Sequence, residues 1–168
     1  MGPRSLAPLA VFFLQCVPYG WQYGYAVDPS LPAVEKAAVK KAVASWEAEL
    51  PGPYPSKLEF YELPWENDLP GRIIYVAAAP LETVNAACGG SGFVGCTMHL
   101  RWPDQNQMLI LLPSDRVPLT DVNALAAHEF GHALGLHHQP GPVLMNPTLN
   151  PRIPGPTTGD VVQFLLTR

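Results

Sequence analysis

Three histidines and one glutamate stand close together in the second half of the chain. His128 and His132 are four residues apart, so on a helix their rings would project from one face, about one turn apart. Two imidazoles at this spacing can share one Zn²⁺ ion. Glu129 follows the first histidine, where its carboxylate can take a proton from a water molecule without binding the metal. The spacing therefore predicts a zinc site with a base beside it.

Gly135 and His138 extend this pattern. Gly135 can adopt a left-handed conformation that ends a helix, and the chain can then turn back and bring His138 to the same metal. Three neutral imidazoles leave one position for water, which is typical of a catalytic zinc site rather than a structural one. His137 could in principle take the place of His138, but the spacing favours His138, and we expect His137 to be exposed. The alternative is that these histidines have only a core or surface role. Such a role would not require the glutamate and the glycine at fixed spacing from three histidines.

The elements that must position these residues alternate between strand and helix patterns. Runs of apolar and β-branched residues predict strands at 21–27, 58–63, 72–78 and 107–112. We expect a short edge strand over 92–99, and a first long helix that begins near 30–32 and ends at 51–53. A second helix, with Thr120 as its N-cap, carries the histidines. This order predicts an α/β (α+β) fold with a mixed, twisted sheet of about five strands.

The pattern from His128 to His138, followed by Met145, resembles the metzincin zinc peptidases. Residues 126–136 resemble the matrixin branch of that group, the catalytic domain of the matrix metalloproteinases. The resemblance implies a metzincin-like catalytic domain over 21–168. It also implies that His128, His132 and His138 hold one Zn²⁺ ion and that Glu129 is the general base of a zinc endopeptidase.

The same resemblance assigns supporting roles around this centre. Residues 143–147 would form the Met-turn, which places Met145 and Pro147 beneath the metal. Asp160 would brace that turn from a C-terminal helix over 159–166. Protein or peptide substrates would lie extended along the edge strand near 93–97, with Phe93, Val94 and Gly95 as the expected contacts.

Two positions depart from the matrixin pattern. Gln139 stands where matrixins usually have serine, and Asn146 stands where they usually have tyrosine, so the specificity pocket should differ. Astacins and serralysins have a tyrosine beyond the Met-turn that approaches the metal. Tyr75 is the last tyrosine of this chain, which excludes that arrangement. His99 is the one remaining histidine, so we expect no second, structural zinc. Asp104 lies in a candidate loop for calcium (Ca²⁺), but no dense set of oxygen ligands supports such a site.

Residues 1–20 have the pattern of a signal peptide, with Arg4 followed by an uncharged, apolar run over 6–17. We therefore expect a secreted protein, extracellular or periplasmic; the alternative is an apolar first element that stays in the mature protein. The run is too short for a stable membrane span. Cys16 lies within this apolar run and has three alternative roles. It is a passive residue of the signal peptide, a lipidated cysteine or a thiolate that inhibits the metal site. In an oxidising compartment Cys88 and Cys96 could form a disulfide; the alternative is two free thiols.

The composition limits the possible partners. The formal net charge is −4, which argues against a nucleic-acid binder of the usual basic type. Charged residues make up only 14% of the 168 residues, whereas 20 are proline. Six prolines follow His138 and predict a stiff specificity loop, a feature that would suit a heat-stable enzyme: Pro140, Pro142, Pro147, Pro151, Pro154 and Pro156.

We expect a monomeric, secreted zinc-dependent endopeptidase. A non-catalytic, zinc-binding extracellular module is one alternative, but it would not need Glu129. A peptidase restricted to its own chain or to one partner is another.

Overall fold

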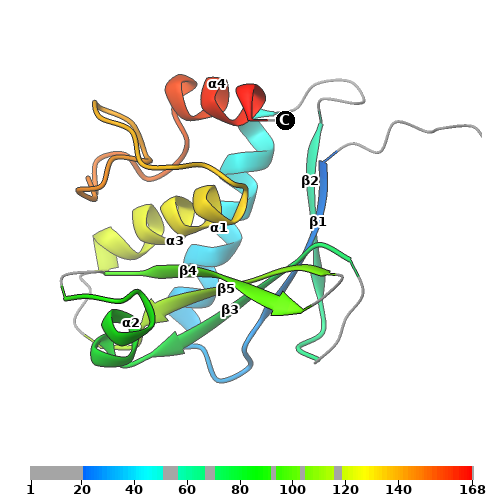
Figure 1. Ribbon diagram of the computed structural model, residues 1–168, viewed down its shortest axis with the longest axis vertical. Helices are drawn as coiled ribbons and strands as arrows, with labels where there is room; N and C mark the ends of the chain where they lie inside the picture. The colour runs from blue at the N-terminus through cyan, green and yellow to red at the C-terminus, as the bar shows by residue number, and fades with distance from the viewer. Residues whose placement is uncertain are drawn as a thin grey trace, which may run out of the picture.

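Figure 1 shows the computed structural model of the protein, which describes residues 21–50, 57–66, 71–91, 94–102, 105–115 and 119–167. The proposed signal segment 1–20 and Phe93 lie outside the described residues. Nine elements follow one another along the chain: β1 (Trp21–Val27), α1 (Ala33–Glu49), β2 (Leu58–Leu63), β3 (Ile73–Ala79), α2 (Leu81–Ala87), β4 (Cys96–Trp102), β5 (Gln105–Pro113), α3 (Leu119–Ala133) and α4 (Thr158–Leu166).

The five strands form one mixed sheet in the order β2-β1-β3-β5-β4. The pairs β1–β2, β1–β3 and β3–β5 are parallel, whereas β4 runs antiparallel to β5 at the edge of the sheet. The predicted α/β class with a mixed sheet, a first long helix, a histidine-bearing helix and a C-terminal helix is confirmed.

The edge strand is displaced from its predicted range of 92–99. β4 covers Cys96–Trp102, because its limits come from the hairpin with β5, in which Trp102 pairs with Gln105 and Cys96 pairs with Leu111. Local composition could not reveal this register, since the glycines before Cys96 resemble the start of an edge strand. Val94 and Gly95 therefore precede the strand.

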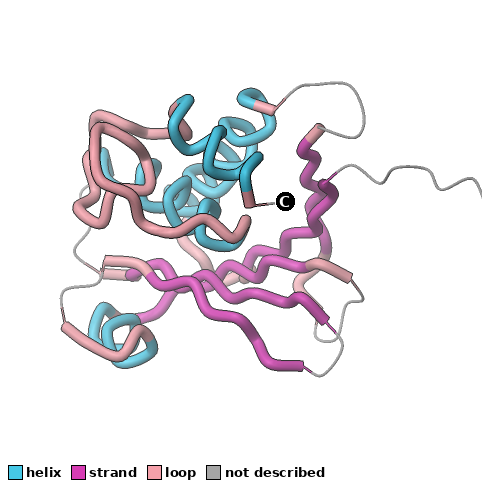
Figure 2. Tube along the Cα trace, turned by 45° about the horizontal axis from the view of Figure 1, so that its top comes forward, coloured by secondary structure: helices cyan, strands magenta, loops and turns pink. Residues whose placement is uncertain are grey.

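Helices cover both faces of the sheet (Figure 2). α1 and α3 pack on one face, where Trp46, Phe130 and Leu134 are fully buried. The Trp46 indole N–H donates a hydrogen bond of 2.9 Å to the carbonyl of Ala127, which ties α1 to the helix that carries the histidines. This contact satisfies the buried indole and sets the position of α3 over the sheet.

The short helix α2 lies on the opposite face and was not among the predicted elements. Its first backbone N–H, that of Leu81, donates to the carboxylate of Asp115 at 2.7 Å. Since this cap comes from a residue far along the chain, no local signal marked the helix start. Val84 of α2 and Cys96 of β4 are buried together in a small cluster on that face.

Among the described residues, no helix has the length and apolar character needed to cross a membrane.

Candidate metal centre

α3 carries His128, Glu129 and His132, and the chain leaves it at Gly135. Gly135 has φ = 84°, and its N–H donates to the carbonyl of His132 at 2.8 Å. The next N–H, that of Leu136, donates to the carbonyl of Gly131 at 3.0 Å. This left-handed cap reverses the chain. It brings His138 back to the helix face that bears the other two histidines.

The three rings meet at their Nε2 atoms. His138 Nε2 lies 3.2 Å from His128 Nε2 and 3.1 Å from His132 Nε2, and one ligand atom from each ring falls within 4.8 Å of the others. Tetrahedral zinc with Zn–N bonds of about 2.0–2.1 Å places its nitrogen ligands roughly 3.4 Å apart. The spacing of the rings therefore fits a single Zn²⁺ ion.

Backbone carbonyls determine which ring nitrogens carry protons. His128 Nδ1 lies 2.8 Å from the carbonyl oxygen of Leu144, and His132 Nδ1 lies 2.9 Å from that of Leu136. A carbonyl oxygen only accepts, so both Nδ1 atoms must donate. In the neutral rings Nε2 is then a bare lone pair, and two lone pairs face His138 Nε2. A cation between them resolves this arrangement, as expected for metal-binding imidazoles with supporting carbonyls.

The environment keeps these rings neutral. Burial lowers the pKa of His132 to about 4, against the opposing effect of its hydrogen bond to Leu136. Burial also lowers the pKa of His128, and burial together with His137 lowers that of His138. Neutral imidazoles are the form that binds metals.

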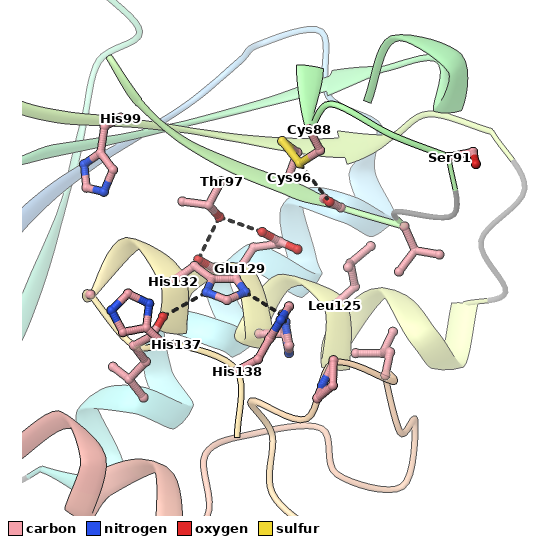
Figure 3. Close-up of a pocket in the computed structure, with 17 residues that line it drawn as sticks. Cys88, Ser91, Cys96, Thr97, His99, Leu125, Glu129, His132, His137 and His138 are labelled. Carbon is pink, nitrogen blue, oxygen red and sulfur yellow. Dashed lines mark hydrogen bonds between the residues drawn. A yellow bond between two sulfur atoms is a disulfide. The ribbon is translucent and has the colours of Figure 1, made fainter. Parts of the chain in front are cut away.

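Glu129 points into the same cleft and is only 4% exposed. Burial raises the pKa of its carboxyl group to about 7, although a hydrogen bond from Thr97 lowers it. Thr97 Oγ1 lies 2.6 Å from Glu129 Oε2 and 3.0 Å from the Glu129 backbone oxygen (Figure 3). Thr97 was expected only at the end of the substrate-binding edge, 93–97, and its contact with Glu129 was not predicted, because threonine on a strand carries no motif.

Met145 is fully buried. A side chain at Gly131 of α3 would collide with the Met145 sulfur, so the glycine gives Met145 its space. The expected partner of this turn, Asp160, is also fully buried. Its carboxylate accepts hydrogen bonds of 3.0 Å from the N–H groups of both Leu144 and Met145.

Asp160 also caps its own helix, accepting from Thr157 N at 2.8 Å and Thr157 Oγ1 at 2.7 Å. Burial alone would raise the pKa of Asp160, but these hydrogen bonds and those from the Met145 turn hold it below its usual value. Asp160 is therefore an ionised acceptor that joins α4 to the turn that contains Leu144 and Met145.

Gln139 and Asn146, the two residues that depart from the matrixin pattern, both form hydrogen bonds. Gln139 Nε2 donates to Asp160 Oδ1 at 3.1 Å, and the Gln139 backbone N–H donates to the carbonyl of Met145 at 2.9 Å. Asn146 Nδ2 donates to the carbonyl of Gly141 at 2.8 Å. Gln139 thus links the residue after His138 to Asp160, a connection that the sequence did not reveal.

A cleft of about 540 Å³ opens beside these groups. Val94, Gly95, Thr97 and His99 line it along the edge strand. From the other side it is lined by Leu125, by Pro147 and Leu149 of the proline-rich segment, and by the exposed His137. A disulfide joins Cys88 to Cys96 at the cleft wall, with Cα atoms 5.9 Å apart.

No family model matches the sequence, and no curated protein matches it. Among solved structures, the chain is similar to the crystal structure of an archaemetzincin from Methanopyrus kandleri. The two share 15% sequence identity with a TM-score of 0.54, over 89% of this chain and 97% of that one. This likeness concerns the fold, and the finer resemblance to matrixins stays a prediction. The chain has a mixed α/β fold similar to that of archaemetzincin, with a three-histidine site that can hold a metal ion.

Proposed function

We propose that this protein is a zinc-dependent endopeptidase of the metzincin type, with a matrixin-like motif. One observation carries the proposal: three imidazole Nε2 atoms converge beside a buried carboxylate, Glu129, at the edge of a cleft. The likeness in fold to an archaemetzincin supports it. A structural zinc site would have no use for Glu129 at this place.

The chain's own groups suit peptide hydrolysis. Zinc held by His128, His132 and His138 would supply a Lewis acid for the scissile carbonyl and for water. Glu129 takes a proton from the attacking water and passes it to the nitrogen of the leaving amine. Burial raises the pKa of the Glu129 carboxyl group, which favours its acceptance of a proton from water. No serine or cysteine nucleophile is needed.

The edge strand offers a place for the substrate. β4 pairs with β5 along one side only, so its other side can form backbone hydrogen bonds with an extended peptide. Such pairing does not need a free chain end, which favours cleavage within a chain. Protein or peptide segments are therefore the proposed substrates, lying past Val94 and Gly95 toward Glu129.

We also propose that the protein is secreted and acts as a monomer. The signal pattern over 1–20 supports export. The Cys88–Cys96 disulfide is of the kind that forms and persists in oxidising compartments, and it supports the same location.

Removal of the general base tests the proposal. Glu129→Gln keeps the shape of the side chain but cannot accept the proton, so it should retain zinc and lose peptidase activity by at least about 100-fold. Glu66→Gln, an exposed and distant change of the same kind, should leave activity unchanged. Zinc content and hydrolysis of a casein or a peptide library measure both effects.

The alternatives give different results in the same assays. A non-catalytic zinc-binding module would bind zinc but cleave nothing in its wild-type form. A peptidase restricted to itself would cleave its own N-terminal segment and spare the library. Activity that survives both Glu129→Gln and zinc chelation would overturn the proposed function.

A further inference from the structure

Gly95, just before β4, and the first two residues of β4, Cys96 and Thr97, form what we call the 95–97 segment. Within it, Gly95 and Thr97 lie against Glu129. Thr97 Oγ1 is 2.6 Å from Glu129 Oε2 and 3.0 Å from the Glu129 backbone oxygen. A hydroxyl group that contacts both the carboxylate and the backbone of one residue restrains its side-chain torsions. The 2.6 Å separation is typical of a strong hydrogen bond to a carboxylate.

Gly95 restricts the other carboxylate oxygen. A Cβ atom at Gly95 would lie 2.6 Å from Glu129 Oε1 and 2.7 Å from Leu125 Cδ1. Glu129 Oε1 therefore occupies the space that a side chain at position 95 would take. The glycine is needed here for this close approach rather than for its backbone conformation, since its φ is not positive.

Cys96 anchors the segment from the opposite face. Its side chain is 2% exposed and packs with Val84 and Leu111, and its disulfide joins it to Cys88 just after α2. Because successive residues of a strand point to opposite faces, Cys96 can be held in this cluster while Thr97 faces the cleft. The segment is thus fixed by side chains on both sides.

We infer that Gly95 and Thr97 are positioning residues that hold the Glu129 carboxylate for proton transfer, on a segment anchored by the Cys88–Cys96 disulfide. This inference rests on the proposed function, in which Glu129 is the general base. Positioned bases act only within a narrow range of geometry, so loosening the carboxylate should slow the chemical step rather than weaken substrate binding.

The first experiment compares Thr97→Val with Thr97→Ser in the zinc-loaded full chain. Valine keeps the shape but lacks the hydroxyl, so kcat should fall at least about tenfold while KM stays within about twofold. Serine keeps the hydroxyl and should restore most of kcat. Thr83→Val, the same change at an exposed position of α2, is the matched control and should behave as wild type.

Gly95→Ala provides an independent variant that removes no hydrogen-bonding group. Its methyl group should displace Glu129 Oε1 and lower kcat at full zinc content. Wild-type kcat in both Thr97→Val and Gly95→Ala would overturn the inference. A fall in melting temperature without a fall in kcat would reduce Thr97 to a structural link between β4 and α3, and would overturn it as well.

A spectroscopic readout separates this inference from the proposed function. The Glu129 carboxyl ¹³C resonance, assigned by its loss in Glu129→Gln, should shift in Thr97→Val and Gly95→Ala but not in Thr97→Ser or Thr83→Val. If the resonance moves while the wild-type protein cleaves no peptide, the proposed function fails and the contact with Glu129 stands. If peptides are cleaved but neither kcat nor the resonance responds, the positioning role fails alone.

Discussion

The carboxylate of Asp160 accepts a hydrogen bond from the Leu144 N–H at 3.0 Å, and the carbonyl of the same Leu144 lies 2.8 Å from His128 Nδ1. A single residue of the Met145 turn therefore joins α4 to a proposed zinc ligand. A carbonyl that accepts from the other ring nitrogen of a metal-binding imidazole fixes the tautomer and orientation of that ring. The strength of the metal site should thus depend on a residue that cannot touch the metal.

Asp160→Asn tests this connection. Asparagine keeps the size but replaces one acceptor oxygen by an NH₂ group, so part of the buried set of donors loses its partner. We expect the free energy of unfolding to fall by about 2–4 kcal/mol. Zinc affinity should fall by about 10–100-fold, because His128 is no longer held in place. Urea denaturation and competition with a chelator measure the two effects, and wild-type values in both would contradict this role.

The stabilisation by Asp160 should depend on pH. The folded state holds the pKa of Asp160 below its usual value, so the ionised carboxylate stabilises the fold at pH values above its unfolded pKa of about 3.9. This contribution is lost as the pH falls through that value toward the lower folded pKa. The difference in unfolding free energy between wild type and Asp160→Asn should therefore be full at pH 6 and smaller at pH 3. An equal difference at both pH values would show that charge is not the cause.

His138 and His137 form a matched pair for the metal site. His138 Nε2 lies within 3.2 Å of the Nε2 atoms of the other two rings, whereas the contact given by His137 is a hydrogen bond that its carbonyl accepts from Gln163. His138→Ala should lower zinc affinity by more than the roughly 100-fold that loss of a supporting hydrogen bond causes. His137→Ala should keep zinc affinity within a few-fold of wild type. The reverse result in a zinc titration would reassign the third ligand.

Gly131→Ala should have two opposite effects on the free energy of unfolding, one through helix propensity and one through packing. Alanine is favoured over glycine inside a helix by about 1 kcal/mol, which alone predicts a more stable protein. Here a Cβ would collide with the Met145 sulfur and lie 3.2 Å from Trp46 Cζ2, so overpacking should cost about 1–3 kcal/mol and the variant should be less stable. In a Met145→Ala background the penalty should shrink, and a double-mutant cycle measures that coupling. Additive effects would show that the two residues do not compete for space.

The disulfide should stabilise the fold modestly. Cys88 and Cys96 are eight residues apart, and a loop of this size corresponds to about 2.5 kcal/mol in the chain-entropy model. Replacing both cysteines by alanine should lower the free energy of unfolding by about this amount. A reductant should produce the same loss in wild type and no further loss in the variant. Wild-type stability under reduction would contradict the prediction.

Local patterns made most elements of the fold predictable. Apolar runs marked β1, β2, β3 and β5, and helical spacing marked α1 and α3, because each of these depends on neighbours within one segment. α2 could not be seen in the same way, since its cap is supplied by Asp115 from beyond the next two strands. The limits of β4 were also misjudged, because pairing with β5 decides them.

The proposed ligand set and the proposed base follow from the residue types and their spacing. Two histidines four residues apart must share a helix face, and a glycine three residues later permits the reversal that returns His138. The groups that support these residues could not be identified without the three-dimensional arrangement of the chain. The carbonyl of Leu144 that fixes the His128 tautomer, and the hydroxyl of Thr97 against Glu129, come from segments remote in the chain. Their placement follows from strand register and helix packing, for which no short motif exists because the contacts form only when distant segments meet.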